Sequence, residues 1–375
     1  IMAREAFAAA GDPSRFPEQL SLGVEAWEPQ KLYQTSRRRF FPGAADTDDG
    51  SIDVQTGVLD PLLGRSLLQL SMESRSQHRS QDMGAAQPAG PRLTGVILVE
   101  SRVEDEGQEI FSGVDTTLVG LTAGLTGDAR EEARRHLEKY RTSVQAAKDE
   151  FGLDPEAIAP HLMEAMAHLG MARAAAGPDA DVEFEQATAA KGAVVQRAIT
   201  AATGVSFDLR SEDDLLVPGQ TVGVRAQLWN GGRYTLAAPE LELEMPEGWT
   251  AEVLENEGLS AAGTLEPGGI ATWVYRVQVP ADADLSRLYY LREARDGARY
   301  LWPDEPDLWG LPRDPALVHA HATFDYGALA GVTAPSGRTS TEADWRFVGV
   351  DPAFGEFEKP VLVVPEVSVN VSPAG

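Results

Sequence analysis

From Val205 onward, apolar side chains recur at every second position, and this alternation constrains the fold more than any other feature of the chain. In the run TVGVRAQLWN, every second residue from Val222 to Leu228 is apolar, and the Asn-Gly-Gly at 230–232 is typical of a hairpin turn. The runs ELELEMPEGW and IATWVYRVQVP alternate in the same way, with proline and glycine between them. Several strands at this spacing predict an antiparallel, immunoglobulin-like β-sandwich.

The residues before this segment carry helix signals instead. Three helices are predicted, each opened by an aspartate and closed by a glycine: Asp128 to Gly152, Asp154 to Gly177, and Asp179 to Gly204. Their interiors are rich in alanine, so neighbouring helices can approach closely. This pattern predicts a helical hairpin or a three-helix bundle.

The first part of the chain mixes helix and strand signals. IMAREAFAAAG reads as a helix from its first residue without an N-cap before it, so we expect the natural N-terminal part to be missing. The run Thr94–Glu100 is typical of a buried strand. Apolar residues recur at helical spacing from Leu63 to Met72. Together these features indicate the end of an α/β layer domain.

The fold class predicted from these patterns is a multidomain α/β and β protein. We expect an α/β remnant at 1–127, the helical segment at 128–204, an immunoglobulin-like β-sandwich at 205–285 and a second β-rich domain at 286–375. An aromatic, proline-rich connection separates the last two parts.

Charge and composition exclude several classes of function. The net charge is −26, from 58 acidic against 32 basic residues, which argues against binding to nucleic acid or to an anionic membrane surface. The chain has no cysteine, so thiol catalysis and thiolate metal sites are excluded. No apolar run approaches the ~18 residues of a transmembrane helix. An acidic, cysteine-free chain is compatible with an exported protein, although the sequence does not define its compartment.

The stretch SRSQHRSQDMG (74–84) stands out because it is basic in an acidic chain. His, Arg and Gln side chains supply directional donors, which an amide-hydrolysing site uses to position a substrate and to stabilise an oxyanion. The stretch is therefore either a pocket wall, formed by Arg75, His78, Arg79 and Gln81, or a solvated helix end.

This stretch, together with EAFAAAGDPSRFPEQ, GVEAWEPQKLY and IFSGVDTTLVGL, resembles the long bacterial form of the PIG-L/LmbE-like zinc de-N-acetylases. The resemblance also includes LVPGQTVGVRAQLWNGG in the later part of the chain. It implies that residues 1–127 are the C-terminal part of a Rossmann-like deacetylase domain.

The same resemblance implies zinc in the complete family member, held by a His-Pro-Asp-Asp motif and a His-x-x-His motif. Neither motif occurs in this sequence, so we expect this chain to bind no zinc and to be inactive by itself. The implied roles are a catalytic one for His78 and substrate binding for the others: Gln81, Arg75, Arg79, Lys31, Trp27 and Tyr33. A core position beside a strand is the alternative for Trp27 and Tyr33.

Other side chains with possible chemistry have plainer interpretations. His319 and His321 share one face of a strand, but a zinc site needs a third ligand, so ordinary strand histidines are expected. His161 and His168 are interpreted as helix surface or packing. A last group could stack on sugar rings or could be buried in a rigid connector: Tyr300, Trp302 and Trp309. No dinucleotide, Walker or Gly-x-Ser-x-Gly motif is present, so no nucleotide cofactor is expected.

Two functional hypotheses follow from the sequence. In the first, the chain is a fragment of a deacetylase that removes N-acetyl groups from amino-sugar glycans or glycoconjugates. In the second, it is a non-catalytic carbohydrate-binding or structural accessory protein with immunoglobulin-like domains. In both hypotheses, the expected binding partner is a glycan or an amino-sugar substrate.

Overall fold

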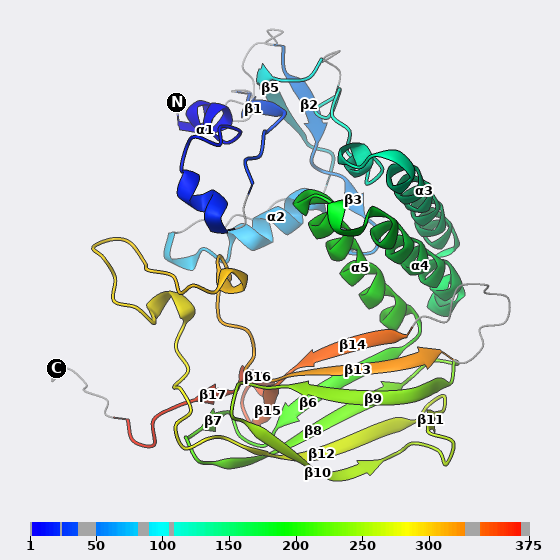
Figure 1. Ribbon diagram of the computed structural model, residues 1–375, viewed down its shortest axis with the longest axis vertical. Coiled ribbons are helices and arrows are strands. Elements are labelled where there is room, and N and C mark those ends of the chain that lie inside the picture. The colour runs from blue at the N-terminus through cyan, green and yellow to red at the C-terminus, as the bar shows by residue number, and fades with distance from the viewer. Residues whose placement is uncertain are drawn as a thin grey trace. The chain divides into compact units, whose positions relative to one another are not determined.

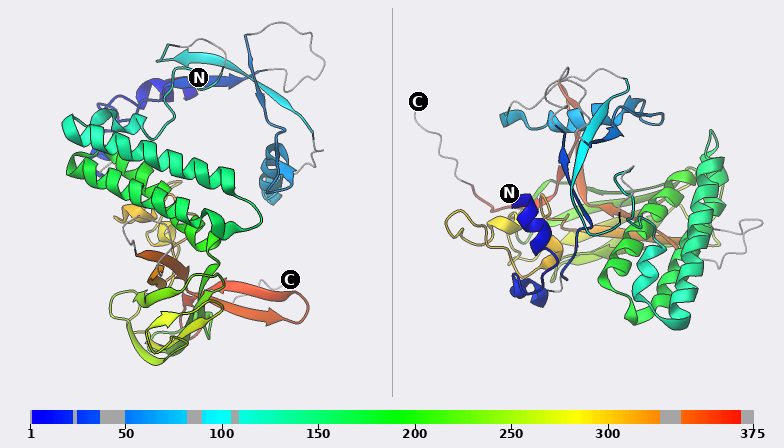
Figure 2. Two further views of the ribbon diagram at one scale, coloured as in Figure 1. Left: turned by 90° about the vertical axis from the view of Figure 1, so that its right-hand side faces the viewer. Right: turned by 90° about the horizontal axis from the view of Figure 1, so that it is seen from above.

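The computed structural model describes residues 2–22, 25–36, 50–81, 90–104, 109–326 and 338–368 (Figures 1 and 2). The chain divides into two compact units, Ile1–Gly120 and Leu121–Gly375. Within the described ranges, no helix is both long enough and apolar enough to cross a membrane.

The first unit is built on a three-stranded antiparallel sheet. Its strands lie in the order β1 (Lys31–Thr35), β5 (Leu93–Ser101) and β2 (Ile52–Gln55). The other elements, with η for a 3₁₀ helix, are α1 (Met2–Ala9), η1 (Pro17–Leu22), β3 (Leu59–Asp60), β4 (Arg65–Ser66), α2 (Leu67–Arg75) and η3 (Arg79–Gln81). Arg102 anchors α1, because its guanidinium donates to the carbonyl of Phe7 at 3.1 Å and lies 4.7 Å from the centre of that ring.

The structure confirms the helix at the start, the strand at 94–100 and a helix that includes Leu67 and Leu70. The predicted burial of the strand is wrong for most of β5, whose residues are half-buried because each sheet face is only partly covered. Helix α2 buries no side chain, and Leu67 is half exposed. The strand pairs of this sheet are antiparallel, whereas the strands of a Rossmann-like layer are mostly parallel. The sheet therefore does not confirm the predicted Rossmann-like domain, which stays a prediction.

The second unit begins with three helices. These are α3 (Gly127–Glu150), α4 (Ala159–Ala176) and α5 (Val182–Ala202), with η4 (Gly120–Gly124) before α3, η5 (Pro155–Ile158) before α4 and η6 (Gly177–Asp179) after it. Helix α4 packs against both α3 and α5.

The predicted helix boundaries hold at some ends and shift at others. Gly177, with φ of 61°, ends α4 as predicted. The N-cap of α5 is Asp181 rather than Asp179, and its carboxylate accepts from the backbone N–H of Phe184 at 2.7 Å. Helix α3 begins at Gly127 without a side-chain cap, so the predicted capping box at Asp128 is wrong.

The rest of the second unit is a β-sandwich of two main sheets (Figure 1). One sheet has the order β10-β12-β8-β6-β15-β16 and the other has the order β11-β9-β13-β14. The bounds are β6 (Val205–Ser211), β7 (Leu215–Leu216), β8 (Thr221–Asn230), β9 (Leu236–Glu244), β10 (Thr250–Glu257), β11 (Thr264–Leu265), β12 (Ile270–Gln278), β13 (His319–Tyr326), β14 (Thr339–Asp344), β15 (Arg346–Asp351), β16 (Gly355–Pro360) and β17 (Leu362–Val363).

The apolar residues that alternate in the sequence form part of the core of this sandwich. Val222 to Leu228 bury every second side chain of β8, while Arg225 and Trp229 are exposed. Phe324 from β13 and Trp345 beside β15 are almost fully buried in the same core. The β-rich fold of this region is therefore confirmed.

Strands from the two predicted β domains share the two sheets. β13 pairs with β9, and β15 pairs in parallel with β6, so the boundary predicted at 285/286 falls inside one sandwich. Arg346 of β15 fixes the parallel pair, because its guanidinium donates to Asp208 of β6 at 2.7 Å.

The helices are joined to the sandwich by polar contacts. The amide of Gln196 in α5 donates to the carbonyl of Ser340 at 2.6 Å, and the hydroxyls of Thr203 and Tyr326 are 2.6 Å apart. Burial raises the pKa of Tyr326 to about 12, so this phenol is neutral at physiological pH. Arg233, in the loop after β8, binds Asp154 at 3.0 Å.

Candidate functional site

Four of the predicted site residues lie at and after the end of α2. Arg75 is the last residue of α2, and Arg79 and Gln81 bound η3. The N–H of His78 donates to the carbonyl of Arg75, and that of Gln81 donates to the carbonyl of His78, both at 3.1 Å. Arg75, His78 and Gln81 are thus spaced three residues apart along these backbone hydrogen bonds. All four side chains are exposed.

The other three predicted residues lie in and before β1. The hydroxyl of Tyr33 donates to the carbonyl of Ile110 at 2.9 Å, so this tyrosine ties β1 to a distant loop. Lys31 is half-buried opposite Ser101 in the sheet, and Trp27 is 61% exposed. These positions neither confirm nor contradict substrate binding by the three residues, which stays a prediction.

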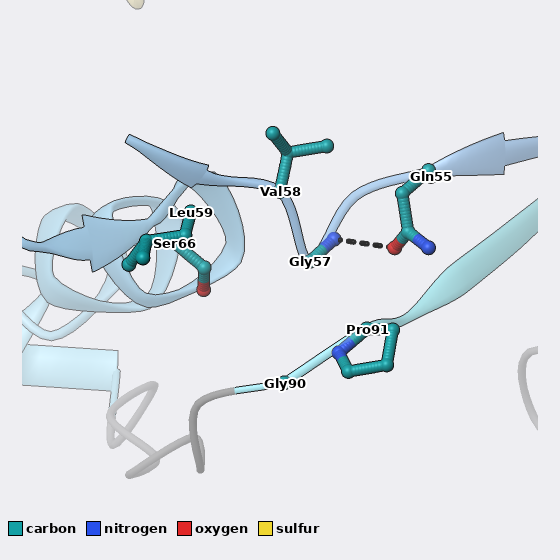
Figure 3. A pocket seen from close by; sticks show the side chains of 7 residues that line it. All are labelled: Gln55, Gly57, Val58, Leu59, Ser66, Gly90 and Pro91. Atoms are coloured by element: carbon teal, nitrogen blue, oxygen red, sulfur yellow. Dashed lines mark hydrogen bonds between the residues drawn. The ribbon is translucent and has the colours of Figure 1, made fainter. Parts of the chain in front are cut away.

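A pocket of about 350 Å³ lies elsewhere in the first unit (Figure 3). It is lined by Gln55, Gly57, Val58, Leu59, Ser66, Gly90 and Pro91, and none of the seven predicted residues is among them. Its few polar groups already serve the backbone, since the carbonyl oxygen of the Gln55 side chain accepts from Gly57 and from Arg92. The hydroxyl of Ser66 caps α2. The pocket therefore offers little chemistry of its own.

The strand histidines pair with carboxylates across the sheet. His319 lies 2.8 Å from Asp344, and His321 lies 3.4 Å from Glu244. The described part of the chain holds no group of three or more His, Asp or Glu side chains placed to bind a metal ion. These residues therefore do not fit a zinc site.

Five aromatic side chains gather in the segment between β12 and β13, and we name them the aromatic platform. They are Tyr289, Tyr290, Tyr300, Trp302 and Trp309. Neighbouring rings have their centres 5.2–6.1 Å apart, and three of the four contacts are edge-to-face. Such geometry is the one that aromatic quadrupoles favour.

Tyr289 is the buried centre of the platform, in η7 (Tyr289–Leu291). Its hydroxyl donates to the carbonyl of Leu311 at 3.1 Å and accepts from the N–H of Gly310 at 3.0 Å. Its own N–H donates to a carboxylate oxygen of Asp314 at 2.8 Å. The segment after η8 (Pro306–Leu308) is thereby tied back to the segment after β12.

Arg292 provides the second tie in this region. Its guanidinium binds Glu305 at 2.9 Å and Asp314 at 2.6 Å, so one side chain joins three parts of the segment. The indole N–H of Trp309 donates to the carbonyl of Pro303 at 2.8 Å. These contacts hold the rings in place before any ligand arrives.

The exposed side of the platform consists of Tyr300 and Trp302, which are 46% and 48% exposed. A tight turn brings Tyr300 there, because Asp296 and Arg299 exchange two backbone hydrogen bonds around Gly297, whose φ is 61°. The Arg295 guanidinium lies 5.7 Å from the centre of the Tyr300 ring.

The structure shows both buried and exposed aromatic surface in this segment, and stacking on sugar rings stays a prediction. The segment buries some aromatic surface, as a rigid connector would, and it also presents two large rings to solvent. The sequence interpretation missed Tyr289 and Tyr290. The adjacent tyrosines directly before a charged run were a usable signal, since tyrosine supplies both a ring and a hydrogen-bonding hydroxyl.

Comparison with known families adds one match. The model of the "NPCBM-associated, NEW3 domain of alpha-galactosidase" matches residues 216–293. These residues run from β7 through β12 to Tyr289 and Tyr290. A putative endo-alpha-N-acetylgalactosaminidase of Renibacterium salmoninarum is 35% identical over 79 residues, which are 21% of this chain and 5% of that protein. The chain thus spans about a twentieth of the curated relative that it matches.

Solved structures give only distant likenesses. The secreted serine protease VesC of Vibrio cholerae is 9% identical, with 43% of this chain and 27% of that one covered and a TM-score of 0.21. A GH20 exo-β-N-acetylglucosaminidase of Vibrio harveyi, in complex with N-acetylglucosamine, is 10% identical, with 45% and 20% covered and a TM-score of 0.21. Likenesses at these TM-scores carry no argument. The comparisons therefore show that residues 216–293 are similar to the carbohydrate-related NEW3 domain.

Proposed function

We propose that the second unit is a carbohydrate-binding part of a protein that acts on glycans, and that the aromatic platform is its contact surface. The observation that carries this proposal is the exposure of Tyr300 and Trp302 on a base fixed by the buried Tyr289. Tyr289 and Tyr290 lie within the residues similar to the NEW3 domain, and the other rings follow directly. The name of the glycosidase relative favours glycans that contain N-acetylgalactosamine.

The platform suits a sugar because pyranose rings present apolar C–H faces that pack on indole and phenol rings. Large rigid aromatic side chains provide contact area at low conformational entropy cost. The ties made by Tyr289 and Arg292 order the segment in advance, so binding has less entropy to overcome. Polar groups at the edge of the rings, such as the Arg295 guanidinium, are available to sugar hydroxyls.

A Trp302→Ala variant is expected to bind such glycans about tenfold more weakly or worse, because truncation of a hot-spot aromatic contact costs about 2 kcal/mol or more, and about 1.4 kcal/mol is already tenfold. The measurement is calorimetric titration of the full chain with oligosaccharides that contain N-acetylgalactosamine. Trp302 is half exposed, so its loss should leave thermal unfolding nearly unchanged.

Trp229 provides a matched control. It is 50% exposed and lies at the end of β8 that pairs with Ile270, whereas the connector follows the other end of β12. Trp229→Ala should retain wild-type affinity. Equal losses in the two variants, or no loss in Trp302→Ala, would contradict a platform site.

We further propose, on the resemblance of SRSQHRSQDMG and the neighbouring stretches, that residues 1–127 belong to a PIG-L/LmbE-like de-N-acetylase. The exposure of Arg75, His78 and Gln81, which are linked by two backbone hydrogen bonds at a three-residue spacing, supports this proposal. The described residues contain no group of three or more His, Asp or Glu side chains placed to bind zinc.

In an enzyme that also carries the zinc motifs, His78→Ala should lower kcat/KM by roughly a hundredfold, as the loss of a positioned donor does. The comparison variant is Arg79→Ala, which lies outside this three-residue spacing and should have a smaller effect. Deacetylation of an N-acetylglucosamine derivative is the assay. Wild-type turnover by a folded His78→Ala enzyme would contradict a role in catalysis and would favour the alternative, in which this stretch is a solvated helix end.

A further inference from the structure

Two histidines face one another between the first two helices of the second unit. His136 lies on the buried face of α3, and His168 lies on α4 with a side chain that is 13% exposed. Their Nδ1 atoms are 3.1 Å apart, and their ring centres are separated by 5.2 Å. Sequence patterns predicted helix surface or packing for His168, and the structure shows packing against a partner that those patterns did not reveal.

The surroundings select one arrangement of protons. The guanidinium of Arg135 is 3.5 Å from Nε2 of His136, which makes that nitrogen an acceptor and leaves the ring proton on Nδ1. Nε2 of His168 is 3.9 Å from the carboxylate of Glu164, which favours a proton there. His136 Nδ1–H therefore donates to the bare Nδ1 of His168, and two neutral rings form the pair.

Any added proton disrupts this arrangement. A proton on Nδ1 of His168 would set two N–H groups against each other, and a proton on Nε2 of His136 would place a second cation beside Arg135. Burial lowers the pKa of His136, and His168, Arg135 and Lys139 lower it further, against an opposing effect of Glu132. Burial also lowers the pKa of His168, with Lys139 in the same direction and Glu164 opposed.

We propose that the His136–His168 pair is a pH-sensitive latch, which holds α3 on α4 near neutral pH and loosens it in mildly acidic solution. Helix α3 packs chiefly on α4, with a smaller contact to η5. It is also the first long helix after the chain leaves the first unit at Gly120.

The direction of the effect follows from linkage. Both histidines have a lower pKa in the folded chain than the 6.5 of the free group, so the unfolded form takes up protons first as the pH falls. The stabilisation is fully present above about pH 6.5 and is lost progressively below it. Leu137 and Tyr140 stay buried on the same face of α3, so we expect a loosened helix rather than an unfolded one.

Hydrogen exchange of the full chain tests the latch. After correction for the intrinsic pH dependence of exchange, protection of α3 amides should fall about tenfold or more between pH 7.5 and pH 5, because the opened helix takes up protons that the closed pair excludes. Protection of β12 should stay constant as an internal reference. The double variant His136→Gln/His168→Gln, which cannot titrate, should show no such fall.

His161→Gln is the matched control, because His161 lies on the same helix pair but bonds to Glu150 at 2.8 Å, away from the latch. It should retain the wild-type response. A histidine titration of the wild type by NMR gives a second measurement that needs no variant, and it should show two imidazoles that protonate below the free value. Constant α3 protection in the wild type, a fall that persists in the double variant, or ordinary titration of both rings would each overturn the latch.

Discussion

A Tyr289→Ala variant is expected to lose glycan binding at the aromatic platform, although Tyr289 is buried and cannot touch a ligand. Removal of a buried aromatic ring costs about 3–5 kcal/mol of folding free energy. It also leaves the N–H of Gly310 and the carbonyl of Leu311 without their partner. Because Trp302 packs edge-to-face on the Tyr289 ring, we expect the exposed side of the platform to become disordered.

Tyr289→Phe separates the ring from the hydroxyl. This variant keeps the ring contacts and should lose only about 1–3 kcal/mol, with binding weakened but present. Near-ultraviolet circular dichroism and tryptophan fluorescence report the order of Trp302 and Trp309, and titration with the glycan reports binding. Full affinity in Tyr289→Ala would show that glycan binding at the platform does not depend on the buried Tyr289 ring.

A Phe324→Ala variant is expected to lower the free energy of unfolding of the sandwich by about 3–5 kcal/mol, since the ring is fully buried in the shared core. Phe324 lies on β13, beyond the residues that match the NEW3 model. The expected loss follows from the pairing of β13 with β9, which makes residues after the connector part of the same sandwich.

Phe354→Ala is the comparison variant, because Phe354 is 90% exposed in the turn between β15 and β16. Its loss should change stability by no more than about 0.5 kcal/mol. Urea unfolding followed by circular dichroism and tryptophan fluorescence measures both variants. Similar stabilities for the two variants would contradict a core shared between β9 and β13, and would favour the separate domain predicted from the sequence at 286–375.

Local sequence patterns predicted the helices and strands of this chain better than they predicted which of these elements pair with one another. The two-residue period of β8 and the glycine that ends α4 follow from short-range physics, and the structure has both. The join of β15 to β6 depends on contacts across more than a hundred residues, which no local pattern encodes.

The candidate sites show the same difference between local spacing, which the sequence reveals, and long-range contacts, which it does not. The backbone hydrogen bonds that join Arg75 to His78 and His78 to Gln81 are local, three residues apart in the sequence. The partnership of His136 with His168 depends on how two helices align, so the sequence left His136 unnoticed. Similarly, the burial of Tyr289 depends on a segment that returns from Gly310.

The parallel pairing of β6 with β15 also affects how the protein is made. β6 ends at Ser211 and β15 begins at Arg346, so a ribosome adding about 5–20 residues per second needs roughly 7–27 s to supply the partner. During that interval one edge of β6 is open to other chains, and open edges favour aggregation. Asp208 and Arg210 are charged side chains of β6, and charged residues on an open strand oppose pairing with other chains. Asp208, which later accepts from Arg346, therefore serves the nascent strand before it serves the finished sheet.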